Sequence, residues 1–376
     1  MRMLLAAVAV LAAAGSLEAQ FSVTSVAVTD APRRLAAADL DGDGDTDLLV
    51  VERGAGDTAR LEALLNQGGT FVLGWSQVES VAYPDWETWD VDLGDTDDDG
   101  DADIVYCVPP GSPRQRLNDG QGQFPVLTGV PTYSVQFEHT LGDTDQDGCL
   151  DVVYYEPDFF FDSYFGTLAG QCNGTFIFGS DWIMLTADLE GRRRIALGDV
   201  TGDGRTDATF TSLVSGLRLF RGQSPAPGSS KPGWAFPKLV DPTPCADAVI
   251  ADLEGDGRPD IAATVPSLDA IEVFRTNGHG APGHPRHFAA GESPSGLVAA
   301  DLDLDGVVDL AVIGAAPAVQ LLRGRGDGAF DPPVAFHVGG VPWDIAVADL
   351  DGDLDPDLAV TLASKLSLTL LSNETR

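Results

Sequence analysis

A nine-residue acidic stretch that occurs seven times constrains the fold of this chain more than any other feature of its sequence. The first copy, residues 39–47, reads DLDGDGDTD, and the copies begin at Asp39, Asp95, Asp143, Asp199, Asp252, Asp301 and Asp349. Successive starts lie 48 to 56 residues apart. A recurrence of this length is typical of repeat proteins, in which each repeat folds as one supersecondary unit against its neighbours. We number the copies loops 1 to 7 and the residues within each copy positions 1 to 9.

The loops have the composition of a site for a hard cation. Positions 1, 5 and 9 are Asp in every loop, and position 3 always carries a side-chain oxygen. Position 7 varies so widely that only its backbone carbonyl oxygen is common to all loops. Position 6 is Gly in six loops, which predicts a turn with positive φ. Calcium accepts about six to eight oxygen ligands in flexible geometry, so the sequence predicts up to seven calcium ions, one in each loop.

The predicted calcium ligands are the residues at positions 1, 3, 5, 7 and 9. In loops 1 to 3 they are Asp39, Asp41, Asp43, Asp45, Asp47, Asp95, Asp97, Asp99, Asp101, Asp103, Asp143, Asp145, Asp147, Cys149 and Asp151. In loops 4 to 7 they are Asp199, Thr201, Asp203, Arg205, Asp207, Asp252, Glu254, Asp256, Arg258, Asp260, Asp301, Asp303, Asp305, Val307, Asp309, Asp349, Asp351, Asp353, Asp355 and Asp357.

Two other interpretations of the loops are weaker. A solvated acidic turn without a cation would crowd several carboxylates, at about 1 kcal/mol for each like-charged pair even in water. An EF-hand needs a bidentate Glu at position 12 and a helix on each side. Position 12 is instead Val50, Tyr106, Tyr154, Phe210, Ala263, Val312 and Val360. Each loop therefore leads into an apolar strand.

Each repeat is predicted to contain four short strands, A to D, with the acidic loop between A and B. In repeat 1 these strands are Arg34–Ala38, Leu48–Glu52, Arg60–Leu65 and Phe71–Gln77. The residue before each loop is Ala or Gly, which suits innermost strands that crowd together. Four-stranded units arranged radially form a β-propeller. The sequence therefore predicts an all-β fold, a seven-bladed β-propeller with four-stranded antiparallel blades.

The two ends of the chain predict how the ring closes. The last repeat supplies strands A, B and C at Asp344–Ala348, Leu358–Thr361 and Ser367–Ser372. An additional strand, Phe21–Val28, precedes the first repeat. We expect this N-terminal strand to complete the last blade as its strand D, because that pairing leaves no open sheet edge between the first and last repeats.

These features resemble the FG-GAP/VCBS repeat family and the calcium-binding propeller of integrin α-subunits, over about residues 21–376. The residues that carry the resemblance are the seven acidic loops, glycine turns before an aromatic such as Asn173–Phe176, and Ile313–Pro317. The resemblance implies calcium in the A–B loops on one face, ligands often engaged on the opposite face, and a role in cell adhesion. Thr201, Glu254 and Leu354 depart from the motif, so calcium is less secure in loops 4, 5 and 7.

The remaining composition bears on location and partners. Residues 1–19 read as a secretory signal peptide, with Arg2 before an apolar run and a small-residue cleavage site, which leaves 20–376 as the propeller. That apolar run is too short to span a membrane. The net charge of −36 disfavours nucleic acid and anionic membranes as partners. We expect a monomer that is secreted, periplasmic or on the cell surface, without membrane insertion.

The four cysteines predict one disulfide. Cys149 lies in loop 3 and Cys172 in the C–D turn of the same blade. Both turns belong to one face of one small sheet, so we expect these two cysteines to pair in an exported chain. Cys107 and Cys245 belong to blades 2 and 5, which separates them too far for a bond.

An aromatic group on blades 2 and 3 is the candidate ligand-binding surface on the face opposite the calcium loops. It comprises Tyr83, Trp86, Trp89, Tyr155, Phe159, Phe160, Phe161 and Tyr164, interleaved with acids. An exposed aromatic patch usually marks a binding site; the alternative is that these rings fill the space within loops and between blades. Three histidines at His279, His284 and His287 could bind a transition metal, although a flexible Gly/Pro loop is the simpler interpretation.

The functional hypothesis is a non-enzymatic binding or adhesion module for an extracellular protein or glycan. The alternative is a carbohydrate-active enzyme, such as a polysaccharide lyase, on a propeller scaffold. A lyase needs a basic residue close to a bound uronate, whereas the aromatic patch is acidic and contains only His139, at a core position of a strand A. The sequence therefore favours binding.

Overall fold

The structure is a computed structural model. It describes residues 21–56, 58–80, 89–107, 113–131, 138–157, 162–178, 183–186, 194–224, 233–277 and 282–374. Within these ranges the fold is all-β, apart from one 3-10 turn at Pro266–Leu268.

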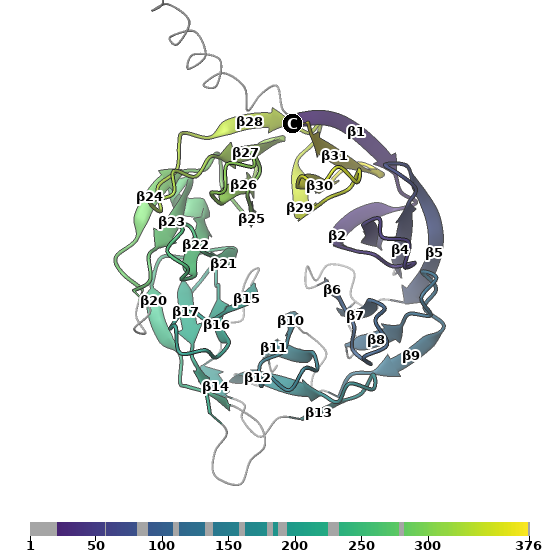
Figure 1. The fold of residues 1–376 in the computed structure, drawn as a ribbon, viewed down its shortest axis with the longest axis horizontal. Helices are drawn as coiled ribbons and strands as arrows, with labels where there is room; N and C mark the ends of the chain where they lie inside the picture. The colour runs from purple at the N-terminus through teal and green to yellow at the C-terminus, as the bar shows by residue number, and fades with distance from the viewer. Residues whose placement is uncertain are drawn as a thin grey trace, which may run out of the picture.

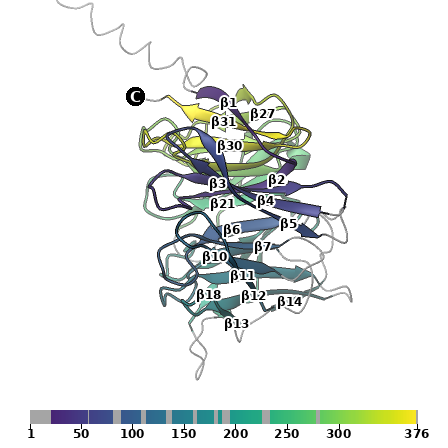
Figure 2. The same ribbon diagram turned by 90° about the vertical axis from the view of Figure 1, so that its right-hand side faces the viewer.

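Seven sheets stand around a common axis, each with its first strand innermost (Figure 1). Blades 1 to 3 are β2 (Ala31–Ala38), β3 (Asp47–Arg53), β4 (Thr58–Asn66) and β5 (Phe71–Ser80); β6 (Asp90–Gly94), β7 (Asp103–Cys107), β8 (Arg114–Leu117) and β9 (Val126–Gly129); and β10 (Glu138–Gly142), β11 (Asp151–Pro157), β12 (Asp162–Gly170), β13 (Phe176–Phe178) and β14 (Ile183–Thr186). Blades 4 and 5 are β15 (Ile195–Gly198), β16 (Asp207–Phe210), β17 (Leu217–Phe220) and β20 (Lys238–Asp241); and β21 (Ala248–Ala251), β22 (Asp260–Val265), β23 (Ala270–Phe274) and β24 (Arg286–Ala289). Blades 6 and 7 are β25 (Gly296–Ala300), β26 (Asp309–Ile313), β27 (Ala318–Leu322) and β28 (Val334–His337); and β29 (Pro342–Ala348), β30 (Asp357–Leu362), β31 (Ser367–Asn373) and β1 (Phe21–Ala27). The predicted seven-bladed propeller is confirmed, and Figure 2 shows the ring edge-on.

The ring closes through its first strand, as predicted. β1 pairs antiparallel with β31 along its whole length, from Phe21 opposite Asn373 to Ala27 opposite Ser367. The ring of Phe21 also packs edge-on against Phe336 of blade 6, with ring centroids 5.4 Å apart. The closing strand is therefore bound by its own sheet and by the preceding blade.

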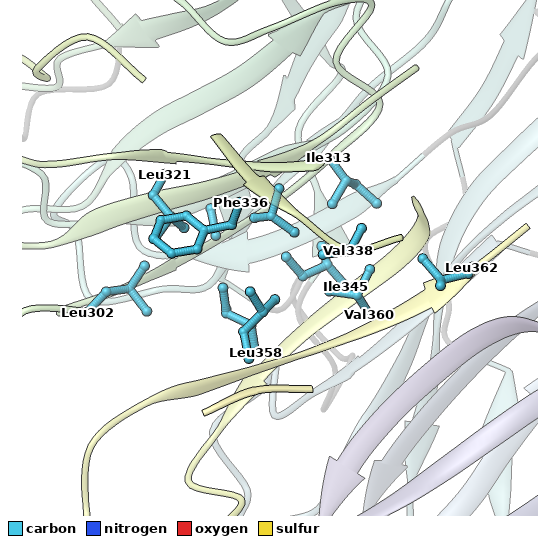
Figure 3. Packing of buried hydrophobic residues seen from close by; sticks show 12 residues of the cluster. Leu302, Ile313, Leu321, Phe336, Val338, Ile345, Leu358, Val360 and Leu362 are labelled. Atoms are coloured by element: carbon cyan, nitrogen blue, oxygen red, sulfur yellow. The ribbon is translucent and has the colours of Figure 1, made fainter. Parts of the chain in front are cut away.

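The core is divided among the interfaces between blades. In the described part of the chain, buried apolar residues form seven clusters, and each cluster joins two adjacent blades. Figure 3 shows the cluster between blades 6 and 7, where Leu302 and Phe336 face Leu358. Burial of apolar area at these interfaces, at about 25 cal/mol per Å², holds the blades together.

The small residue before each loop has a packing cause. A Cβ at Gly142 would lie 2.6 Å from Leu197 Cδ1, and a Cβ at Gly198 would lie 2.6 Å from Ile250 Cγ2. In both cases the obstructing side chain comes from the inner strand of the next blade, two residues before its own loop. The inner strands thus approach closely only because one side of each contact is glycine or alanine.

Blade 4 differs from the predicted repeat. Between β17 and β20 the chain forms a small hairpin of β18 (Gly222–Gln223) and β19 (Gly233–Trp234). Trp234 is buried there, donates from Nε1 to Thr167 Oγ1 at 2.9 Å, and packs edge-on against Phe165 of blade 3. The hairpin of β18 and β19 therefore helps to join blades 3 and 4.

Candidate metal centres

All seven acidic loops have the same backbone conformation. Position 6 has positive φ in every loop, between 74° at Leu354 and 96° at Gly100. Position 4 also has positive φ in every loop, although Asp98, Gln146 and Leu304 occupy it in three of them. The left-handed turn at position 4 was not predicted, and its signal in the sequence was the glycine found there in the other four loops.

The invariant Asp residues at positions 1 and 5 hold this conformation through backbone hydrogen bonds. The position 1 carboxylate accepts the N–H of position 6 in each loop, as when Gly44 donates to Asp39 Oδ2 at 3.0 Å. The position 5 carboxylate accepts the N–H of position 7, as when Asp45 donates to Asp43 Oδ1 at 2.9 Å. Both carboxylates are thereby fixed around the centre of the loop.

The Asp at position 9 ties each loop to the C–D turn of its blade. In loop 1, Asp47 is fully buried and accepts the N–H groups of Leu40 at 2.7 Å and Asn66 at 2.6 Å. The equivalent bond recurs in the other blades, as when Asn118 donates to Asp103 in blade 2; in blade 7, where β1 supplies strand D, the donor Asn373 is the last residue of β31. A carboxylate oxygen that accepts one N–H keeps a second lone pair for a metal.

Some buried side-chain oxygens of the loops, including two at position 3, lack a hydrogen-bond partner among the described residues. Asp41 Oδ1 and Asp97 Oδ1 are buried oxygens that accept no hydrogen bond within the described residues, and both oxygens of Asp355, at position 7 of loop 7, are in the same state. A buried anionic oxygen without a partner is costly. A cation at the loop centre would satisfy these oxygens, so the residues present fit the calcium ion that the repeat motif implies.

Three carboxylate residues offer oxygens within 4.8 Å of one another in several loops. These sets are Asp39, Asp41 and Asp43; Asp95, Asp97 and Asp99; Asp143, Asp145 and Asp151; and Asp301, Asp303 and Asp309. Three of the sequence-predicted side-chain ligands are therefore brought together in each of loops 1, 2, 3 and 6. Loop 3 is additionally tied to its turn, because Cys149 and Cys172 form a disulfide with Cα atoms 5.0 Å apart, the pair expected from the sequence.

Burial in the loops raises the pKa of their carboxyl groups, to about 6 for both Asp47 in loop 1 and Asp357 in loop 7. These folded values lie above the ordinary Asp pKa of about 3.9, so the folded state binds the protons more tightly than the unfolded chain does. The stability from such protonation is present below about pH 4 and is lost as pH rises through the folded pKa. We therefore predict that the calcium-free protein melts at a lower temperature at pH 8 than at pH 5.5.

Calcium should reverse that pH dependence, because it competes with protons for the same oxygens and binds best to deprotonated ligands. Melting curves at both pH values, after removal of calcium and again with calcium at saturation, test the prediction. A calcium-free protein that is more stable at pH 8 would contradict it.

A second set of residues, six of them charged, lies at the centre of the ring, five residues before each loop. This central charge ring consists of Arg34, Asp90, Glu138, Arg194, Asp247, Gly296 and Asp344. Arg194 donates to Asp90 Oδ1 at 3.2 Å and to Asp344 Oδ1 at 3.1 Å, and so links blades 2, 4 and 7. Asp90, Asp247 and Asp344 also accept the N–H of the next inner strand, as from His139 to Asp90 at 3.0 Å.

His139 lies beside this ring as a core residue. Its side chain is fully buried, with Nε2 3.2 Å from the carbonyl oxygen of Val105 and 3.6 Å from Asp92 Oδ2. Together with Asp90 and Asp92 it forms a further group whose ligand atoms lie within 4.8 Å of one another. Burial raises the pKa of Asp92 to about 7.

The structure corrects the proposed aromatic surface at two residues. Trp89 is only 5 % exposed within the core between blades 1 and 2, and Tyr155 is 1 % exposed in the core between blades 3 and 4. The Tyr155 ring packs at a tilt against the Phe210 ring, with ring centroids 4.6 Å apart, and the Tyr155 hydroxyl donates to Ser163 Oγ at 2.8 Å. Trp89 directly precedes β6 and Tyr155 lies in β11, and both rings pack between blades, so neither offers a surface to a ligand.

Of the other residues predicted to form the aromatic surface, the structure describes only one. Tyr164, in β12, is partly exposed. Tyr83, Trp86, Phe159, Phe160 and Phe161 lie outside the described residues. The histidine group is also incompletely described: His279 lies outside the described ranges, His284 is exposed, and His287 belongs to β24 with Nδ1 3.6 Å from Glu272 Oε1.

Within the ranges that the structure describes, no helix has the length and apolarity that a membrane span requires.

Comparisons with known proteins agree with this geometry. A family model described as FG-GAP-like repeat matches residues 39–106, 252–312 and 303–360, which contain loops 1, 2, 5, 6 and 7. No curated protein is significantly similar to the chain. A chain in the crystal structure of BBS1N in complex with ARL6DN, soaked with lead, is similar in fold, with a TM-score of 0.57, 11% identity, and coverage of 94% of this chain and 95% of that one. The V. cholerae biofilm matrix protein Bap1 is also similar, with a TM-score of 0.50, 11% identity, and coverage of 94% and 91%.

Proposed function

This chain is a β-propeller built from FG-GAP-like repeats, and on that premise we propose that it is a secreted, calcium-stabilised binding module for an extracellular protein or glycan. The observation that carries the proposal is the set of buried carboxylate oxygens at Asp41, Asp97 and Asp355, which belong to the acidic loops and accept no hydrogen bond from the residues that the structure describes. Calcium suits these oxygen-only ligand sets better than a transition metal does. The disulfide between Cys149 and Cys172 supports an oxidising, extracellular location.

The division of the molecule into two faces supports a binding role. The acidic loops and C–D turns are joined to each other by the bonds from position 9, so they form one structural layer. The segments between β11 and β12 and before β6 and β10 connect at the opposite ends of these strands. Residues 81–88 and 158–161 in those segments carry Tyr83, Trp86 and Phe159–Phe161, and large aromatic residues dominate the energetics of many interfaces.

We propose that the module has no enzymatic activity. A lyase would need a base that reaches its substrate, and His139, which lies among acids near Arg194, has a fully buried side chain. Its ring is held between Asp90, Asp92 and Val105. These contacts support a structural role for His139 rather than a catalytic one.

A glycan array and a pull-down from extracellular material, both at saturating calcium, test the binding proposal. Trp86→Ala combined with Ala at Phe159, Phe160 and Phe161 should abolish binding, because these anchors supply most of the contact energy. Trp343→Ala is the matched control: this ring lies in blade 7 beneath the guanidinium of Arg33, 4.3 Å from its centroid, away from blades 2 and 3. Undiminished binding by the quadruple variant would refute the aromatic site. Trp89 and Tyr155 are left intact because their loss would disturb the core.

A further inference from the structure

The residue immediately before each C–D turn divides the blades into two classes. We call it the pre-turn residue, and it precedes the residue whose N–H bonds to the Asp at position 9. In blades 1 to 7 the pre-turn residues are Leu65, Leu117, Ala169, Arg221, Arg275, Arg323 and Ser372. The three arginines are thus confined to three consecutive blades, 4, 5 and 6.

The pre-turn side chain lies beside position 3 of the loop in its own blade. A Cβ at Gly122 would lie 2.9 Å from Leu65 Cδ2 and 3.6 Å from Asp41 Cβ, so these two side chains are neighbours. Gly174 stands in the same relation to Leu117 and Asp97, at 3.1 Å and 3.5 Å. The pre-turn residue of blade 5 occupies the equivalent position. A Cβ at Gly328, in the C–D turn of the next blade, would lie 3.4 Å from Arg275 Cδ.

An arginine at this position reaches the acids that would bind the cation. Arg323 donates from Nη2 to Asp305 Oδ2 at 2.8 Å, and its Nε lies 2.6 Å from Asp303 Oδ2. Arg275 forms an ion pair with Glu254 at position 3 of loop 5. The acids at position 3 are largely buried in both loops, with side chains 8 % exposed for Asp303 and 9 % for Glu254.

Blades with a leucine and blades with an arginine as the pre-turn residue differ in what contacts the acid at position 3. Asp41 and Asp97, beside Leu65 and Leu117, keep a buried oxygen without a hydrogen bond in the described structure, whereas Asp303, at the equivalent position, has a guanidinium against it. A guanidinium supplies several N–H donors in a plane and one positive charge. It therefore provides to the loop the charge and the contacts that a bound cation would otherwise provide.

We propose that Arg275 and Arg323 take the place of calcium in loops 5 and 6, so that these loops are held by a cation belonging to the chain itself. The proposal rests on the calcium binding proposed above for the other loops. Blades 7, 1, 2 and 3, whose pre-turn residues are Ser, Leu, Leu and Ala, then form a continuous calcium-dependent sector of the ring. Loop 4 has Thr201 at position 3 and Arg205 paired with Asp203 at 2.8 Å, so it belongs with the calcium-independent loops.

Counting the calcium ions bound per chain tests this assignment. Arg275→Leu and Arg323→Leu introduce the residue that blades 1 and 2 have at this position, and each variant should bind one calcium ion more than the wild type. Arg325→Leu is the matched control, because Arg325 lies two residues further on and pairs instead with Asp331. An unchanged count in both pre-turn variants would overturn the proposal.

The reciprocal experiment removes an acid at position 3. Asp41→Asn should lower the calcium count by one, whereas Asp303→Asn should not change it. A loss of one ion in Asp303→Asn shows that loop 6 binds calcium and overturns the proposal while leaving the proposed function intact. Wild-type protein that binds no calcium at all contradicts the proposed function instead.

Amide hydrogen exchange distinguishes the calcium-dependent loops from the calcium-independent loops. The Gly44 amide bonds to Asp39 at 3.0 Å in loop 1, and the Gly306 amide bonds equivalently to Asp301 at 2.8 Å in loop 6. Removing calcium should increase exchange at least tenfold at Gly44 and leave Gly306 unchanged. Equal acceleration at both amides would contradict the proposal.

Discussion

Removing calcium should lower the melting temperature by on the order of 10 °C, and adding it back should restore the original value. Extracellular-type sites bind calcium at about 0.1–1 mM. At about 1 mM calcium, a site with a dissociation constant near 0.1 mM contributes roughly 1.4 kcal/mol to the free energy of unfolding. Loops 1, 2, 3 and 7 together would then contribute roughly 6 kcal/mol, which is comparable to the stability of a whole domain.

The measurement is a thermal melt in EDTA, in calcium and in magnesium. Magnesium should restore little, because it requires a tighter octahedral geometry and gives up its water reluctantly. Identical melting curves in EDTA and in calcium, together with the absence of calcium from purified protein, would exclude the metal sites.

The second large effect is expected from Arg194→Leu, which should lower the free energy of unfolding by about 3–5 kcal/mol. Arg194 bridges Asp90 and Asp344, whose side chains are only 6% and 14% exposed. Burial alone would raise the pKa of Asp90, but His139, Arg194 and Arg34 together lower it, so its carboxylate is charged in the folded protein. Without the guanidinium, two carboxylates of different blades remain close together at the centre of the ring with less compensation.

Arg258→Leu is the control for this variant. Its partner is Asp256 in the exposed part of loop 5, at 3.7 Å, and such surface pairs contribute about 0–1 kcal/mol. Urea denaturation of both variants at saturating calcium gives the comparison. A loss for Arg194→Leu no larger than that for Arg258→Leu would show that the central charge ring does not stabilise the fold.

The fold was predictable because its determinants recur within each repeat. The acidic loop fixes where strands A and B meet, and the spacing of the loops fixes the number of blades. Strand A of the first blade was expected at Arg34–Ala38 and is found as β2 at Ala31–Ala38. The closing strand was expected at Phe21–Val28 and is found as β1 at Phe21–Ala27. Differences of a few residues reflect pairing with neighbouring strands, which local sequence does not specify.

The features that sequence analysis missed depend on contacts between repeats. Tyr155 lies next to acids in the sequence, which suggested an exposed site, but its packing partner Phe210 belongs to the next blade. The contacts of Arg194 join residues 104 and 150 positions apart. The arginines that precede the C–D turns are visible in the sequence. Their role can be inferred only once the structure shows that the pre-turn side chain lies beside position 3 of the acidic loop.

The pairing of β1 with β31 has a consequence for how the molecule reaches its folded state. The Ser25 hydroxyl donates to the carbonyl oxygen of Leu368 across this pairing, and these two residues are 343 positions apart in the chain. Contacts of such high sequence separation are slow to form, because a long loop must close before they contribute any stability. Six blades can each complete a sheet from consecutive residues, but blade 7 must wait for the two remote segments to meet. We therefore expect a late folding intermediate in which the ring is an open arc with an unpaired edge on β31, and such an edge is the point most exposed to association with other chains.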